Sequence, residues 1–257
     1  MLQNKSSIFD FNKQLSHLVY SKFENIKPDS DKSFFIAFII GKAYKTHKAI
    51  MLLCKQGYGE DAFMLARTLF ELMITTSYIF QDDSDERLMR YMEYDWVTRK
   101  KMYDYAVTKD ELSEALNKKV GHEKGGRGVI NQVQTEYKRV MTKYKYNKNG
   151  WSDKSISGMA ESIGRGDAYN TVYKLQCIVA HTNARSINEY MDLTNEGLVF
   201  NIGRNDDSVE KTLVAAFDFL RSIIEEANKQ FTWNLGVSLE SLYEKYVQAI
   251  GKTSARS

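Results

Sequence analysis

The sequence predicts an all-α protein, a single-domain helical bundle with one small β-hairpin. Pro28 is the only proline in 257 residues, so long stretches contain nothing that interrupts helical hydrogen bonds. Between residues 32 and 56 the apolar residues recur at steps of three and four, which is the period of an amphipathic helix. No Ser/Gly/Pro-rich linker divides the sequence, so residues 1–257 are expected to form one domain.

The first half of the chain predicts three helices in close succession. An amphipathic helix over residues 6–25 ends before the turn at residues 27–30, which offers capping residues for a helix over residues 32–56. Gly57-Tyr58-Gly59 closes this second helix, and the third helix, residues 61–80, is apolar on nearly every face and should be central. One stripe on the second helix should face the core or a partner chain: Ile36, Ile40, Ala43, His47, Ile50 and Cys54.

The second half predicts further helices and one hairpin. Two short apolar runs flank Thr194-Asn195-Glu196-Gly197, which indicates a β-hairpin near residues 190–202. The remaining helices are expected over residues 82–107, 129–145, a short stretch from 155, 167–181, 206–230 and 239–250.

Composition favours a cytoplasmic protein without a membrane partner. The first twenty residues mix charges throughout and lack the apolar core of a signal peptide. Cys54 and Cys177 lie in apolar helical patterns, which suits a reducing compartment. The two most apolar segments, residues 34–54 and 62–80, contain charges near their middles, and such charges are costly in lipid. Both segments are therefore predicted to be core helices.

Arg67 and Glu71 are the first candidates for chemistry. They are the only charges between residues 62 and 80, and their spacing of four places them on one helix face. A buried ion pair that satisfies itself and a neighbouring helix end is one interpretation, because charges in apolar surroundings need hydrogen-bonding partners. A catalytic pair is the other.

His181 is the second candidate, at the end of an apolar helix. An imidazole there can act as a general acid or base. It can also simply cap its own helix, since the helix dipole favours a cation at a C-terminus. If the charges of Arg67 and Glu71 need further partners, the polar run His181-Thr182-Asn183 is expected to supply them, so the three residues should share one polar pocket.

The usual signatures of metal and nucleotide binding are missing from the sequence. Cys177 and His181 are four residues apart, but no second pair of ligands at suitable spacing accompanies them. Gly125-Gly126-Arg127-Gly128 lacks the Lys-Ser/Thr that a phosphate loop requires. We therefore expect no metal and no cofactor.

Residues 118–148 form a basic segment that is predicted to be a loop-helix insertion within the domain. It has nine Lys or Arg against two Glu, and its Gly121–Gly128 stretch favours a loop. Nucleic-acid contact through phosphates, with tyrosines for base stacking, is one interpretation, and a solvated helix face is the other. The residues predicted to make this contact are Lys138, Arg139, Lys143, Lys145 and, two turns before His181, Lys174.

Three stretches together resemble an uncharacterised bacterial all-helical family, a domain of unknown function, over roughly residues 35–225. They are an Arg/Glu helix at residues 65–71, a Trp-Ser turn at residues 149–156, and a Tyr-rich helix from Tyr169 that ends in Val179-Ala180-His181. This resemblance implies the fold but no activity.

More distantly, a helical bundle whose late helix bears Ile178-Val179-Ala180-His181 is similar to the HEPN superfamily of prokaryotic RNA-cleaving toxins and defence proteins. That resemblance implies a metal-independent cut of RNA by an arginine and a histidine, and a homodimer. Here Gln176 stands where the superfamily motif has arginine, and its neighbour is Cys177. The guanidinium would have to come from Arg67 or from Arg185.

Two functions therefore remain open. The first is a metal-independent endoribonuclease or toxin of host-defence type, with His181, Arg67, Glu71 and Arg185 as its catalytic set. The second is a non-catalytic helical module that binds a partner protein or nucleic acid. The expected partners are a second copy of the chain, RNA, and a cognate protein or antitoxin.

Overall fold

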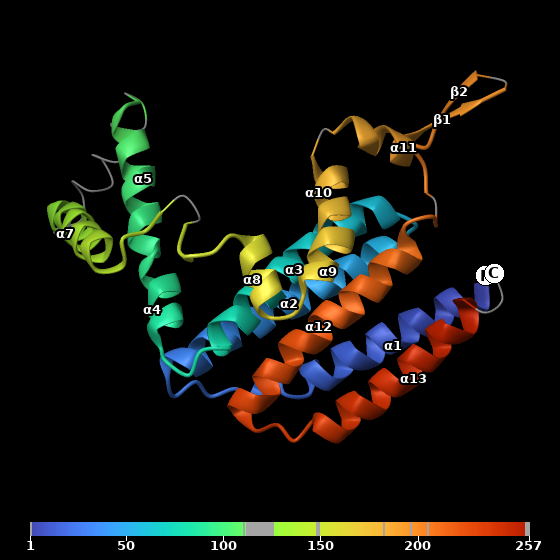
Figure 1. The fold of residues 1–257 in the computed structure, drawn as a ribbon, viewed down its shortest axis with the longest axis horizontal. Coiled ribbons are helices and arrows are strands. Elements are labelled where there is room, and N and C mark those ends of the chain that lie inside the picture. The colour runs from blue at the N-terminus through green and yellow to red at the C-terminus, as the bar shows by residue number, and fades with distance from the viewer. Residues whose placement is uncertain are drawn as a thin grey trace. The chain divides into compact units, whose positions relative to one another are not determined.

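The computed structural model describes residues 2–109, 111, 126–147, 150–181, 183–195, 197–204 and 206–254. The prediction of an all-α fold with one small hairpin is confirmed in this part of the chain (Figure 1). The residues form two compact units, the first made of Met1–Gln81 with Ile156–Ser257 and the second of Asp82–Ser155. The basic segment 118–148 falls in the second unit, and part of it lies outside the described residues. A single domain over the whole chain stays a prediction.

The first unit is built on five long helices. Helix α12 packs against both α2 and α3, and α1 packs against α12 and α13 (Figure 1). Their bounds are α1 Leu2–Tyr20, α2 Asp31–Lys55, α3 Gly59–Phe80, α12 Val209–Phe231 and α13 Gly236–Ser254. The expectation that the third helix is central is confirmed, because Leu69 is fully buried and Leu72 nearly so.

The turn between α2 and α3 depends on two glycines with different roles. Gly57 has φ +77°, the left-handed conformation that lets a helix end without a steric penalty. Gly59 was expected to help close α2, but it begins α3. A Cβ on Gly59 would lie 2.7 Å from the backbone nitrogen of Val209, so the absence of a side chain allows α3 to approach the start of α12.

The apolar stripe of α2 lies in the core. Ile36, Ile40, Ala43 and Ile50 are fully buried against the neighbouring helices of the same chain. The expectation that this stripe is a ready surface for self-association is therefore wrong. A homodimer, if formed, must use another surface.

His47 lies on the same stripe and ties three helices together. Its Nε2 donates to Asn12 Oδ1 at 2.8 Å, and its Nδ1 accepts from the Ser16 hydroxyl at 2.9 Å. Asn12 in turn donates to the carbonyl of Leu213 in α12 at 3.2 Å. Burial, aided by the charge of Lys48, lowers the pKa of His47 to about 3, so the ring stays neutral in the folded protein.

The segment after residue 155 returns to the first unit and carries the hairpin. Helix α8 is Ile156–Ser162, and the expected helix over residues 167–181 divides into α9 Gly166–Ala168, a π-turn Tyr169–Tyr173 and α10 Lys174–Ala180. A short 3₁₀ turn, Ala184–Ser186, and α11, Ile187–Tyr190, lead into the hairpin. Strands β1 Met191–Thr194 and β2 Gly197–Phe200 pair antiparallel, as expected, with Met191 opposite Phe200.

The second unit consists of three described helices. Helices α4 Glu86–Glu93 and α5 Asp95–Val107 replace the single helix expected over residues 82–107, with the break at Tyr94. Helix α7 Gly126–Tyr144 packs on α5 around Val97 and Val140.

Helix α3 is also the one described helix long and apolar enough to cross a membrane. More than half of its most apolar window is buried inside the protein, which is the pattern of a core helix. This agrees with the prediction from its sequence and is consistent with a soluble protein.

Candidate functional site

Arg67 and Glu71 form an ion pair on one face of α3. The Nε of Arg67 donates to Glu71 Oε1 at 2.9 Å, as the spacing of four residues predicts. The two side chains are 28% and 40% exposed. The pair is therefore partly exposed, and the interpretation as a buried ion pair is wrong.

Tyr173 completes the support of this pair from the end of the π-turn. Its hydroxyl donates to the same Glu71 Oε1 at 2.8 Å, and its ring centroid lies 5.4 Å from the guanidinium carbon of Arg67. The Tyr173 ring is itself buried and stacks on Phe70 at 4.8 Å. The guanidinium is thus held by a carboxylate at one edge and an aromatic face beneath it.

The protonation states of these groups follow from their surroundings. Partial burial alone would lower the pKa of Arg67, but the hydrogen bond to Glu71 and its other neighbours raise it above the ordinary value. Burial, and then the hydrogen bond to Glu71, raise the pKa of Tyr173. Arg67 therefore stays cationic, and Tyr173 stays a neutral donor.

His181 meets Arg67 although 114 residues separate them in the chain. The Nη1 of Arg67 lies 3.0 Å from His181 Nε2. Arginine can only donate, so Nε2 must accept, and the imidazole is then neutral with its proton on Nδ1. The side chain of His181 contacts α3 rather than a carbonyl at the end of its own helix, and it is exposed to solvent.

The residues on α10 that reach this site follow a spacing of four. Tyr173, Cys177 and His181 lie on one face of α10, the helix that packs on α3. Cys177 is half-buried and contributes a little to the raised pKa of Arg67. Sequence reasoning singled out His181 and noted Cys177 four residues before it, but it missed Tyr173, although the same spacing was a signal that could have found it.

Arg185 is placed elsewhere. It lines a separate pocket of about 170 Å³, together with Glu189 and Lys211. Within the described residues its side chain makes no hydrogen bond or ion pair with Arg67 or His181. The structure therefore brings together Arg67, Glu71 and His181 from the predicted catalytic set and leaves Arg185 out.

The residues predicted to bind nucleic acid are divided between the two units. Arg139 pairs with Glu93 at 3.0 Å and with Glu136 at 2.7 Å, and Lys143 lies 3.4 Å from Glu93. Lys138 is exposed on the same helix, and Lys145 follows that helix with φ +51°. Lys174 lies in the first unit, over the ring of Tyr169. Two of the five cations are thus already partly neutralised.

The described residues contain no group of three or more His, Cys, Asp or Glu that could hold a metal ion. The side chains of the site supply one cation, one imidazole whose Nε2 lies against that cation, and a carboxylate and a phenol that hold the cation.

No curated protein and no solved structure matches the chain. A family model does match, over residues 34–198, and its description is a family of unknown function, DUF5677. The matched stretch contains Arg67, Glu71, Tyr173 and His181, and it spans more than half of the chain. The description assigns no activity, so the HEPN-like resemblance stays a prediction. The chain belongs to the DUF5677 family of unknown function.

Proposed function

We propose that the protein is a metal-independent endoribonuclease whose catalytic residues are Arg67 and His181. The observation that carries the proposal is the 3.0 Å contact between Arg67 Nη1 and His181 Nε2 at an exposed position. A cation and a neutral base side by side, with access to solvent, are the two groups that cleavage by a ribose 2′-hydroxyl requires.

The reaction would proceed in one displacement at phosphorus. His181 Nε2 takes the proton of the 2′-hydroxyl while the 2′-oxygen forms a bond to the adjacent phosphorus. The bond from phosphorus to the 5′-oxygen breaks, and that oxygen leaves with a proton from solvent. The products are a 2′,3′-cyclic phosphate and a 5′-hydroxyl, and Arg67 stabilises the charge that develops on the phosphate oxygens.

The free protein holds these groups in a resting arrangement. The lone pair of His181 Nε2 is engaged by Arg67. A phosphate is a stronger acceptor for a guanidinium than a neutral imidazole, so substrate would draw Arg67 toward the phosphate and release Nε2 for the 2′-hydroxyl. Glu71 and Tyr173 are positioning residues, since they hold the other side of the guanidinium without reaching the base.

The burial of Gln176 supports Arg67 as the source of the guanidinium. Gln176 occupies the position where the HEPN motif has arginine, and its side chain is fully buried. A group at that position could not reach a substrate at the surface. By the same resemblance we propose a host-defence or toxin role for a homodimeric, cytoplasmic protein.

The hairpin favours the second function, binding of a partner protein. Side chains on both strands and just beyond them are exposed although they are apolar, which is unusual for a soluble surface. They are Leu193, Leu198, Val199, Phe200 and Ile202. A two-stranded hairpin also has unpaired edges that another chain can extend. A cognate protein, an antitoxin or a second copy would be the occupant of this surface.

Cleavage of a labelled RNA by purified protein in EDTA tests the proposal. The proposal predicts cleavage, products that end in 2′,3′-cyclic phosphate, and loss of both in His181→Ala. Inactive wild-type protein that still binds a partner through the hairpin would favour the binding module. Cleavage that requires a divalent metal would also contradict the proposed mechanism.

A further inference from the structure

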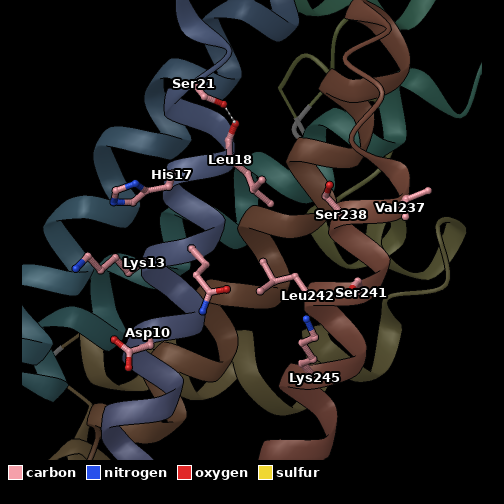
Figure 2. Close-up of a pocket in the computed structure, with 11 residues that line it drawn as sticks. Asp10, Lys13, His17, Leu18, Ser21, Val237, Ser238, Ser241, Leu242 and Lys245 are labelled. Atoms are coloured by element: carbon pink, nitrogen blue, oxygen red, sulfur yellow. Dashed lines mark hydrogen bonds between the residues drawn. The ribbon is translucent and has the colours of Figure 1, made fainter.

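A second feature of the first unit is an open groove between α1 and α2, with a volume of about 750 Å³. One wall is the face of α1 that carries Lys13 and His17, and the other is the face of α2 that carries Lys48, Leu52 and Lys55. Figure 2 shows Lys13 and His17 on the side of α1 that points away from Leu242 of α13. We call this feature the α1–α2 groove.

The cations of the α1–α2 groove are free. Lys13, Lys48 and Lys55 are exposed, and none of them forms an ion pair within the described residues. Beyond its first turn helix α2 carries Lys42, Lys45, Lys48 and Lys55 and no acidic residue, so these four lysines have no carboxylate on their own helix nearby. Asp10 is the one carboxylate in the described lining. The groove therefore has a net positive charge that nothing in the described chain balances.

This contrasts with the basic helix of the second unit. On α7, Arg139 and Lys143 both reach Glu93, and Arg139 also reaches Glu136. A polyanion that bound there would have to displace these carboxylates. Phosphate binding gains most from cations whose only partners are water and counterions, so the α1–α2 groove is the better phosphate-binding surface.

An exposed aromatic side chain lies on α1 outside the residues that line the groove. Tyr20 follows His17 by one turn on the same face of α1, and it is 66% exposed. One side of its ring stacks on Tyr44 of α2, with centroids 6.0 Å apart, and Phe23 packs on the edge of Tyr44. The ring of Tyr20 is thus supported from behind and open in front, which is the arrangement on which unpaired bases stack.

We propose that the α1–α2 groove binds single-stranded RNA, with phosphates on Lys13, Lys48 and Lys55 and a base on Tyr20. Cations without ion-pair partners favour binding of a polyanion. The exposed ring of Tyr20 can stack on a base, so it favours a nucleic-acid strand over an acidic protein. The inference rests on the proposed function, because it names a surface of the first unit where the RNA substrate would bind.

Binding can be measured apart from cleavage in the His181→Ala background. The probe is a fluorescein-labelled single-stranded RNA, titrated at several salt concentrations. Lys13→Gln, Lys48→Gln and Lys55→Gln combined should raise Kd at least tenfold. They should also make the slope of log K against log salt shallower by about 2, since each phosphate contact on a single strand contributes about 0.7. Tyr20→Ala should raise Kd severalfold and leave the slope unchanged. Urea unfolding verifies that each variant folds.

The competing surface is tested by removing the same charge from α7, as Lys138→Gln, Arg139→Gln and Lys143→Gln combined. Because Arg139 and Lys143 already pair with carboxylates, this variant should raise Kd less than the groove variant does. A larger loss from the α7 variant than from the groove variant would overturn the inference, as would equal tightness for polyglutamate, which would indicate an acidic protein. Groove-dependent binding without wild-type cleavage would refute the proposed function alone. Cleavage that survives the groove substitutions with unchanged KM would refute this inference alone.

Discussion

Arg67 on α3 and His181 at the end of α10 are joined by a 3.0 Å hydrogen bond in which the imidazole must accept. The bond fixes the tautomer of His181, because only a ring with its proton on Nδ1 leaves Nε2 free to accept. Glu71 and Tyr173 fix the guanidinium from the other side. The guanidinium of Arg67 and the neutral imidazole of His181 therefore lie together at an exposed position.

Arg67→Ala should leave the fold nearly intact. The side chains of Arg67 and Glu71 are 28% and 40% exposed, and ion pairs of that exposure contribute at most about 1 kcal/mol. Urea unfolding should therefore show a cooperative transition displaced by no more than this amount. Leu69→Ala, two residues along the same helix and fully buried, is the contrasting variant and should cost about 2–5 kcal/mol. A loss of 3 kcal/mol or more in Arg67→Ala would mean that the pair is structural.

Tyr173→Phe should slow RNA cleavage about tenfold by releasing Glu71 from one of its two partners. The ring and its stacking on Phe70 remain, so the free energy of unfolding should fall by only about 1 kcal/mol, the value of one hydrogen bond. Tyr169→Phe is the matched control, because Tyr169 stacks on the ring of Tyr173 and its hydroxyl makes no hydrogen bond within the described residues. Equal losses of activity in the two variants would refute a positioning role for Tyr173.

The stability of the protein should fall as pH falls below about 6.5, through His47. The pKa of His47 is about 6.5 when unfolded and about 3 when folded, so the unfolded chain takes up the proton first. The stabilisation is fully present above pH 6.5 and is lost progressively toward pH 3. As the pH falls from 7.5 to 5, above the titration of ordinary carboxylates, the pH slope of the free energy of unfolding should grow from near zero toward the value for one proton.

His47→Gln should flatten that slope, whatever it does to stability at neutral pH, because the amide does not titrate. A slope unchanged by His47→Gln would show that another group carries the pH dependence.

Gly59→Ala should destabilise the protein by about 1–3 kcal/mol, because the new Cβ would meet the backbone at Val209 and Ser208. Gly41→Ala, in the middle of α2 with nothing within 4 Å of its Cβ position, should instead stabilise by about 0.5–1 kcal/mol. Thermal unfolding of the two variants measures both. Opposite signs are expected, and a loss in both would mean that the contact at Val209 is not the cause.

Much of the fold could be predicted because local chemistry decides it. The single proline, the period of three and four in α2 and the lack of a polar stripe in α3 each depend on a few neighbouring residues. Gly59 shows the limit of prediction from local sequence. Its neighbours in the sequence indicate a turn, but glycine is needed there because α12, about 150 residues later, packs against it. No local pattern predicts that contact.

Some residues of the candidate site could likewise be predicted from local spacing, and others could not. Arg67 and Glu71 could be paired by their spacing on one helix, and the need of their charges for partners pointed to His181. Tyr173 was missed although it lies eight residues before His181, because nothing local shows that its hydroxyl reaches Glu71 on another helix. Arg185 was included because it follows His181 closely, but the turn after α10 directs it to another pocket.

Single-turnover cleavage of one labelled RNA by Arg67→Ala, His181→Ala and the double variant, in EDTA, tests the central claim most directly. When two residues act as one catalytic unit, removing either one removes the contribution of both. Each single variant should therefore cleave at least a hundredfold more slowly than the wild type, and the double variant should be no slower than either single variant. Losses that multiply in the double variant would mean that Arg67 and His181 act independently. A wild type no faster than the double variant would contradict the claim that this contact is a nuclease site.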